Sequence, residues 1–165
     1  MSFTAVELSD LECIRQVANR YCRGVDRLDA DEMKSAYWGD AIDDHGAFVG
    51  NAHEFVDLCM TAHLKYHSTG HCIFNHQIEF DDEIQARGEI YCITWLFHKE
   101  EDVLDTWYGR YLDRYEKRGD EWRIIERVCV HEGTERRNAS PMAIQADAFR
   151  QGMFDRQRPG RPIGP

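Results

Sequence analysis

Four histidines lie close together in the stretch HLKYHSTGHCIFNHQIEF, which spans residues 63–80. They are His63, His67, His71 and His76. On one continuous helix the first three would share a face at positions i, i+4 and i+8, a spacing that suits metal ligands. The breaking sequence Ser-Thr-Gly at 68–70 interrupts such a helix, so we expect no metal site here. We expect His63 and His67 to remain solvated at a helix end and His76 to fill a core or interface position.

His71 is the histidine whose position suits proton transfer. It opens a strand, while Asp26 lies one turn after Cys22 on the apolar stripe of the first helix, so the two side chains can meet between helix and sheet. A buried carboxylate beside an imidazole fixes its tautomer and stabilises the imidazolium, which makes the histidine a better general base. The alternatives are that His71 bonds a loop carbonyl and that Asp26 caps the helix or pairs with a neighbouring arginine. If the fold brings the two together, the pair predicts proton abstraction.

Three helices are predicted before the sheet. Ser9-Asp10-Leu11-Glu12 has the capping-box pattern, so a helix should begin there and carry Asp26 near its end. Asp29 should cap a short second helix, and a first strand follows near residues 41–49. Asn51 repeats the capping pattern for a third helix, which should end before Ser68.

After Gly70 the apolar period changes from 3.6 to 2, which indicates strands. The predicted strands cover residues 71–80, 84–98, 103–117 and 122–131, with a hairpin turn at 118–121. Helices followed by a meander of long antiparallel strands predict an α+β domain with the helices on one face of a curved sheet. His71 falls on the more polar side of its strand, so either a bulge intervenes or another subunit covers the apolar side.

The chain is predicted to divide at residue 135. Residues 1–135 should form the α+β domain, and residues 136–165 a helix from Ser140-Pro141 followed by a basic, partly disordered tail. The six arginines and two aspartates after residue 135 leave residues 1–135 at a net charge of −14, against −10 for the whole chain. Such an acidic body repels phosphate, so nucleic acid and anionic membranes are poor partners.

Neither a membrane span nor a signal peptide is expected. No run approaches the roughly eighteen apolar residues that a span requires, and MSFTAVELSD lacks the basic and apolar regions of a signal peptide. We therefore expect a cytoplasmic protein. Its six cysteines are scattered without a CxxC pair and should be reduced core residues.

Three segments carry a resemblance to a known family. YCRGVDRLDADEM, STGHCIFNHQIEF and GRYLDRYEKRGDEWRIIERV, within about residues 6–133, resemble the SnoaL-like branch of the nuclear-transport-factor-2-like superfamily. Within that branch they are similar to the group of scytalone dehydratase, hexachlorocyclohexane dehydrochlorinase and bile acid 7α-dehydratase. The resemblance implies a cone-shaped barrel in which a curved, mainly antiparallel sheet wraps around N-terminal helices. The superfamily also contains cyclases, isomerases and non-catalytic subunits, so its fold alone does not fix an activity.

The resemblance also implies roles for four residues. Asp26, in GVDR, and His71, in the GH that opens a strand, take the places of the family's catalytic aspartate and histidine. Tyr21 matches a tyrosine of the bile acid dehydratase, and Arg127 matches an arginine that assists the leaving group in the dehydrochlorinase. Tyr21 could equally be a core aromatic, and Arg127 a cross-strand ion-pair partner. Many pocket positions, including Arg110, depart from the dehydrochlorinase, so its substrate does not carry over.

We therefore expect a cofactor-independent lyase that performs a dehydratase-like elimination on a small, apolar, aromatic or alicyclic molecule. Side chains that could bind this substrate are Trp38, Phe48, Phe55, Trp95, Tyr108 and Arg110. The same dyad could serve a retro-aldol lyase, an isomerase or a polyketide-type cyclase, and without access to a pocket it would belong to a non-catalytic binding or accessory subunit. Apolar residues expected on a second sheet face lead us to expect a homodimer or homotrimer. They are Phe74, Ile78, Tyr111 and Tyr115.

Overall fold

The first helix sets the position of Asp26. The structure is a computed structural model that describes residues 3–140, 142–145 and 148–149. Helix α1 spans Ala5–Arg27 and has Thr4 as its N-cap, five residues before the predicted N-cap Ser9, because Thr4 and Glu7 form a capping box of their own. Leu28 ends the helix in the left-handed conformation with φ 52°, which places Asp26 in the last turn.

Two shorter helices follow with the predicted caps. Asp29 caps α2 (Ala30–Lys34), and Asn51 caps α3 (Ala52–Ala62). A single 3-10 turn, η1 (His63–Lys65), then leads directly into strand β3. The third helix ends before Ser68, as predicted, but Ser68, Thr69 and Gly70 do not form the expected break between helix and strand, because they already belong to β3.

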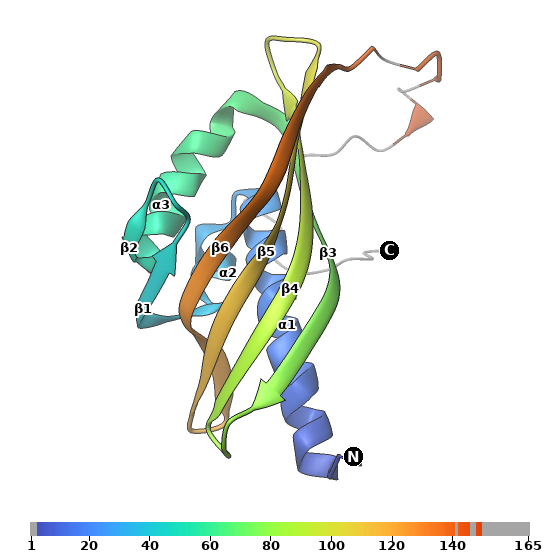
Figure 1. Ribbon diagram of the computed structural model, residues 1–165. Helices are drawn as coiled ribbons and strands as arrows, with labels where there is room; N and C mark the ends of the chain where they lie inside the picture. The colour runs from blue at the N-terminus through green and yellow to red at the C-terminus, as the bar shows by residue number, and fades with distance from the viewer. Residues whose placement is uncertain (1–2, 141, 146–147, 150–165) are drawn as a thin grey trace.

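Six strands form one sheet in the order β2-β1-β6-β5-β4-β3. Their bounds are Tyr37–Asp44 for β1, Val49–Asn51 for β2, Tyr66–Phe80 for β3, Gln85–His98 for β4, Val103–Arg118 for β5 and Glu121–Asn138 for β6. Strands β3 to β6 form an antiparallel meander, while β1 joins β6 in parallel. Figure 1 shows this long twisted sheet with α1 along one face and α2, α3 and the β1–β2 hairpin to one side. The predicted α+β class is confirmed.

The end of the chain differs from the prediction. Strand β6 runs to Asn138 rather than to about residue 131, so the proposed division at residue 135 falls inside a strand. Residues 142–145 carry no helix, and most of the remaining tail lies outside the described residues.

A bulge in β3 explains why His71 points inward. Ile73 pairs with Cys92 of β4, but His76 pairs with Ile90, so three steps on β3 match two on β4. His71 and Ile73 face α1 before the bulge, and His76 and Ile78 face it afterwards. A bulge was one of the two explanations that the sequence left open.

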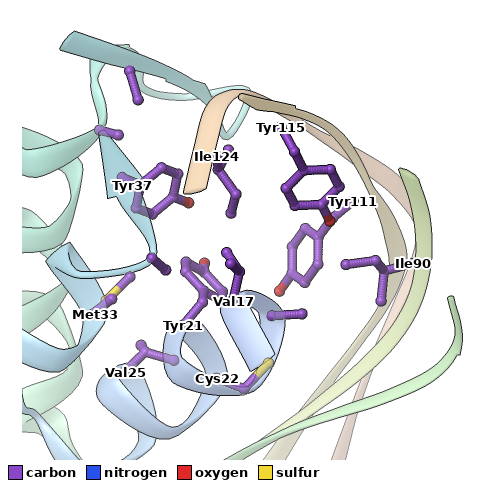
Figure 2. Close-up of a cluster of buried hydrophobic side chains, with 14 of the residues drawn as sticks. Val17, Tyr21, Cys22, Val25, Met33, Tyr37, Ile90, Tyr111, Tyr115 and Ile124 are labelled. Carbon is purple, nitrogen blue, oxygen red and sulfur yellow. The ribbon is translucent and has the colours of Figure 1, made fainter. Parts of the chain in front are cut away.

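The core lies between α1 and the concave face of the sheet. Figure 2 shows Tyr111, Tyr115 and Ile90 projecting from the curved strands toward Val17 and Tyr21 of α1. All six cysteines are free thiols, three of them buried, and Cys13 is exposed. Within the described part of the chain, no helix combines the length and apolarity needed to cross a membrane.

The burial of two tyrosines removes part of the argument for an oligomer. Tyr111 and Tyr115 lie in the protomer core and Ile78 packs against it, so they form no second apolar face. Of the four residues considered, Phe74 is exposed, at 58%. A homodimer or homotrimer stays a prediction that sedimentation at micromolar concentration would test.

Candidate active site

Asp26 and His71 form a direct carboxylate–imidazole pair. Asp26 Oδ1 lies 2.7 Å from Nδ1 of His71 and accepts a hydrogen bond of 2.8 Å from the Thr69 hydroxyl. Asp26 Oδ2 accepts the backbone N–H of His71 at 2.8 Å. Because Thr69 and His71 are two residues apart on β3, both face α1 and hold the carboxylate from the same side. The neighbouring Arg23 forms an ion pair with Glu32, so it does not compete with His71 for the Asp26 carboxylate.

The surroundings favour an ionised Asp26. Burial alone would raise the pKa of its carboxyl, but the hydrogen bonds from His71 and Thr69, together with the charge on His71, lower that pKa below its ordinary value. The side chains of Asp26 and His71 are 14% and 8% exposed. No described residue hydrogen-bonds Nε2 of His71, and that atom is not among the fully buried polar atoms without a partner. Nε2 is therefore the atom through which His71 can exchange a proton with a bound molecule.

His63 packs against His71. Its ring stacks on His71 with centroids 6.0 Å apart, and burial, followed by the charge on His71, lowers the pKa of His63 to about 4. The expectation that His63 is solvated is therefore wrong, whereas His67 is exposed and lies beside Ser68. Among the described residues, no three His, Cys, Asp or Glu side chains converge as metal ligands would.

Tyr21 lies deep in the interior next to the dyad. Its ring is perpendicular to that of His71 at a centroid distance of 6.4 Å, and burial raises the pKa of its hydroxyl well above the ordinary value. The hydroxyl lies 3.4 Å from Nε2 of His45, a residue that follows β1. Nδ1 of His45 contacts Asp43 in turn. This second pair was missed in the sequence, although an Asp-x-His spacing at a strand end places both side chains on one face.

Arg127 is occupied by an ion pair. Its Nε and Nη2 donate to the two oxygens of Asp113, each at 2.7 Å, and both side chains are fully buried. The two residues are direct partners across β5 and β6, which is the cross-strand pairing considered as an alternative for Arg127. The guanidinium also lies 4.1 and 4.2 Å from the ring centres of Tyr21 and Tyr111. Arg127 therefore stabilises the interior, and its Nη1 is buried without a hydrogen-bond partner among the described residues, so its role at the leaving group stays a prediction.

Two of the six candidate substrate-binding residues lie near Tyr21. Phe55 stacks on His45 at 4.0 Å, and Phe48 lies 5.5 Å from Phe55. They form an apolar wall beside the second pair.

The other four candidates lie elsewhere. Trp38 is held between Arg118 and Arg123, and its indole donates to the carbonyl of Glu116, near the far end of β5. Trp95 is the partner of Gly70 on the neighbouring strand and lies over it. Gly70 alternates with Thr69 and His71, so the Trp95 side chain is on the opposite face of the sheet from Asp26. Tyr108 donates to Glu135, and Arg110 pairs with Glu89 and Glu132. The structure does not bring these four side chains to the dyad.

The described surface hollows are separate from the dyad. One of about 520 Å³ lies mainly on the outer face of the sheet, with Arg87, Glu89 and Arg114 in its lining. None of the four hollows described is lined by Asp26 or His71.

Comparison with solved structures identifies the fold. A candidate scytalone dehydratase from Novosphingobium aromaticivorans is similar at a TM-score of 0.74 and 18% identity, over 86% of this chain and 99% of the other. A type 2 hexachlorocyclohexane dehydrochlorinase is similar at a TM-score of 0.75 and 19% identity, over 86% and 97%. A protein of unknown function from Nostoc punctiforme, described as having a cystatin-like fold, is similar at a TM-score of 0.62 and 20% identity, over 80% and 96%. At these identities the likeness shows the cone-shaped fold alone.

The sequence comparison shows the family. No curated protein matches this chain. The family model for the SnoaL-like domain matches residues 6–128, a range that begins in α1, takes in both members of the dyad and ends in β6. The chain therefore belongs to the SnoaL-like domain family and has the nuclear-transport-factor-2-like fold of its structural neighbours.

Proposed function

We propose that this protein is a cofactor-independent lyase that removes a proton and a leaving group from adjacent carbons of a small apolar molecule. The observation that carries the proposal is the pair itself. A carboxylate that receives three hydrogen bonds holds one nitrogen of His71 and leaves the other without a described partner. This is the arrangement that a general base requires.

The reaction follows from the hydrogen bonds. Nε2 of His71 takes the proton, and Asp26 stabilises the positive charge that appears on the imidazole. The bonding electrons form a carbon–carbon double bond as the leaving group departs on the side of Tyr21. The apolar wall of Phe48 and Phe55 favours an aromatic or alicyclic substrate. The names of two structural neighbours, a dehydratase and a dehydrochlorinase, agree with an elimination.

A retro-aldol cleavage, an isomerisation or a cyclisation would begin with the same proton transfer. These reactions differ from elimination in what happens to the electrons afterwards. Product analysis of each substrate tested would separate them.

One observation favours a second candidate function, a non-catalytic binding or accessory subunit. None of the four described hollows is lined by Asp26 or His71, and Tyr21, which lies beside His71, is packed against Tyr37, Tyr111 and the buried Arg127. An elimination requires a substrate between these side chains and His71, whereas an accessory subunit does not.

Two alicyclic probes test the proposal. 3-Hydroxycyclohexanone loses water, and 3-(4-nitrophenoxy)cyclohexanone releases a coloured phenolate, and both reactions start by removal of the proton next to the carbonyl. His71→Gln should lower kcat/KM for both probes by about 10²- to 10⁴-fold, the usual contribution of a general base. His67→Gln is the matched control, since His67 is exposed on the same strand. Equal turnover by wild type and His71→Gln, with both folded, would refute the lyase.

A further inference from the structure

A second carboxylate–imidazole pair lies beside the first and repeats its geometry. Asp43, on β1, is fully buried, and its Oδ1 contacts Nδ1 of His45. Its Oδ2 accepts the hydroxyl of Tyr37 at 2.6 Å. A buried carboxylate is costly unless it is paired, so these partners are what keep Asp43 in the core. As in the first pair, the carboxylate holds Nδ1 and directs Nε2 away from itself.

Nε2 of His45 faces the same tyrosine that borders the first pair. It lies 3.4 Å from the Tyr21 hydroxyl, while the ring of Tyr21 meets His71 edge to face at 6.4 Å. Phe55 stacks on the other side of the His45 ring at 4.0 Å and limits its rotation. Tyr21 therefore stands between two histidines, each held by its own aspartate.

An elimination that expels a hydroxyl group has two proton transfers, and a single dyad provides for one of them. The base must lie within hydrogen-bond reach, about 3 Å, of the proton that leaves carbon, and an acid must lie within the same reach of the departing oxygen. These two substrate atoms are attached to neighbouring carbons. The rings of His71 and Tyr21 meet edge to face with centroids 6.4 Å apart, so a base on His71 and an acid on Tyr21 belong to neighbouring side chains.

We propose that Asp43 and His45 supply, through the Tyr21 hydroxyl, the proton that leaves with the oxygen of the substrate, so that the substrates are alcohols that lose water. This assignment rests on the lyase function proposed above. Tyr21 is the group that touches the leaving oxygen, and His45 and Asp43 act through it.

Atoms and charge are conserved in this step. His71 takes the proton from carbon, and the C–H electrons form the double bond while the C–O bond breaks. The oxygen keeps its bonding pair and takes the proton of the Tyr21 hydroxyl, which receives another from Nε2 of His45. Solvent carries the proton from His71 back to His45, and the net products are an alkene and water.

The assignment separates two kinds of leaving group. Hydroxide is a poor leaving group and has to be protonated as it departs, whereas chloride or 4-nitrophenolate leaves as a stable anion without a proton. A neighbouring protein named as a dehydrochlorinase shares the fold of this chain, but a buried Asp43–His45 pair would serve no purpose in the loss of halide. The pair therefore points to hydroxyl as the group that this protein removes.

The experiment compares kcat/KM for 3-hydroxycyclohexanone with that for 3-(4-nitrophenoxy)cyclohexanone in wild type, His45→Gln, Asp43→Asn and His71→Gln. In His45→Gln and Asp43→Asn the ratio of the hydroxyl probe to the ether probe should fall by about 10²-fold or more, the size of a general-acid contribution. In His71→Gln both values should fall together and the ratio should stay the same. A merely structural role of His45 would lower both probes equally, and that result would overturn the assignment. If His71→Gln instead turns over both probes as fast as wild type, the lyase function itself is refuted.

A second measurement needs no variant, since loss of Asp43 could unfold the core. Wild type is assayed with a series of 3-aryloxycyclohexanones whose phenols differ in acidity. Protonation by the enzyme should make kcat/KM nearly independent of that acidity. A steep increase toward the more acidic phenols would show that no acid assists, and would overturn the proposal.

Discussion

Replacement of Asp26 by asparagine should change both turnover and stability, for reasons that follow from three hydrogen bonds. The carboxylate has only acceptors, and it receives the Thr69 hydroxyl, the His71 backbone N–H and the His71 ring. An asparagine offers one acceptor oxygen and one NH2 donor. The backbone N–H of His71 cannot turn away, so the amide oxygen must take the place of Oδ2. The NH2 group then faces Nδ1 of His71.

The tautomer of His71 changes as a result. An NH2 group can bond Nδ1 only if Nδ1 has no proton, which places the proton on Nε2. Nε2 is then a donor and cannot accept a proton from a substrate. In a serine protease the same exchange of aspartate for asparagine lowers kcat by about 10⁴-fold through the wrong tautomer, and we expect a loss of that order here.

Stability should fall as well. Exchange of hydrogen bonds to a charged acceptor for weaker neutral ones costs about 1–3 kcal/mol. For a chain of this length that corresponds to a decrease in Tm of about 2–4 °C for each kcal/mol.

The stability difference should depend on pH in one direction. The pKa of the Asp26 carboxyl is lowered in the folded protein, so its contribution to stability is present above the pKa of the unfolded carboxyl, about 4. That contribution is lost as the pH falls through the lower, folded pKa. The free energy of unfolding of wild type should therefore exceed that of Asp26→Asn most clearly near pH 7, and the difference should shrink below about pH 4.

Urea unfolding of both proteins at pH 7 and pH 3, together with initial rates on the two cyclohexanone probes, checks these values. Asp120→Asn is the matched control, because Asp120 lies exposed in the β5–β6 turn, where asparagine is also well tolerated. If Asp26→Asn keeps turnover within tenfold of wild type, or if its stability deficit is the same at both pH values, the reasoning from the hydrogen bonds is wrong.

Three further predictions concern the dyad, the buried ion pair of Asp113 and Arg127, and the expected independence of turnover from metal ions. His71→Ala should lose about 10²- to 10⁴-fold in turnover and the Asp26→Asn/His71→Ala double variant little more, because the pair acts as one unit; additive losses in initial rates would contradict this. Asp113→Ala should destabilise the fold by about 3–5 kcal/mol in urea unfolding, because it leaves Arg127 buried without its carboxylate, and replacement of both residues by leucine and methionine should cost less. Dialysis against EDTA should leave turnover unchanged, and recovery of lost activity by a divalent ion would contradict the expectation of a metal-free site.

The sequence predicted the type of most elements, because their signals are local. Caps such as Asp29 and Asn51 act on backbone groups within three residues, and the change of period after Gly70 is visible along the chain. The ends of elements were less predictable. Strand β3 begins at Tyr66 rather than after Gly70, because it pairs with β4 from Tyr66 onward and takes Ser68, Thr69 and Gly70 into the sheet.

The Asp26–His71 pair was predicted because Asp26 could be assigned to the inner face of its helix and His71 to the start of a strand, whereas the inward direction of His71 depended on the bulge in β3. The substrate-binding residues were not predictable, because their direction depends on pairing between strands. Trp95 is one residue from Thr94, the direct partner of His71, and that single step turns the indole to the outer side of the sheet. Arg110 lies outside for the same reason, with Glu89 and Glu132 as partners. The sequence pattern did contain Asp43 and His45, but their link to Tyr21 depends on how β1 docks beside β6.

The bulge in β3 has a consequence for how this protein meets other chains. Strand β3 is the outermost strand of the sheet on its side, and without the bulge its residues from Ser68 to Phe80 would offer a long, regular row of free N–H and C=O groups. Such a row is a template on which the edge of another chain can add, and interruption of its regularity discourages that pairing. Removal of one residue at 74 or 75 would straighten the strand, so the same irregularity that turns His76 and Ile78 inward also protects the molecule against edge-to-edge aggregation.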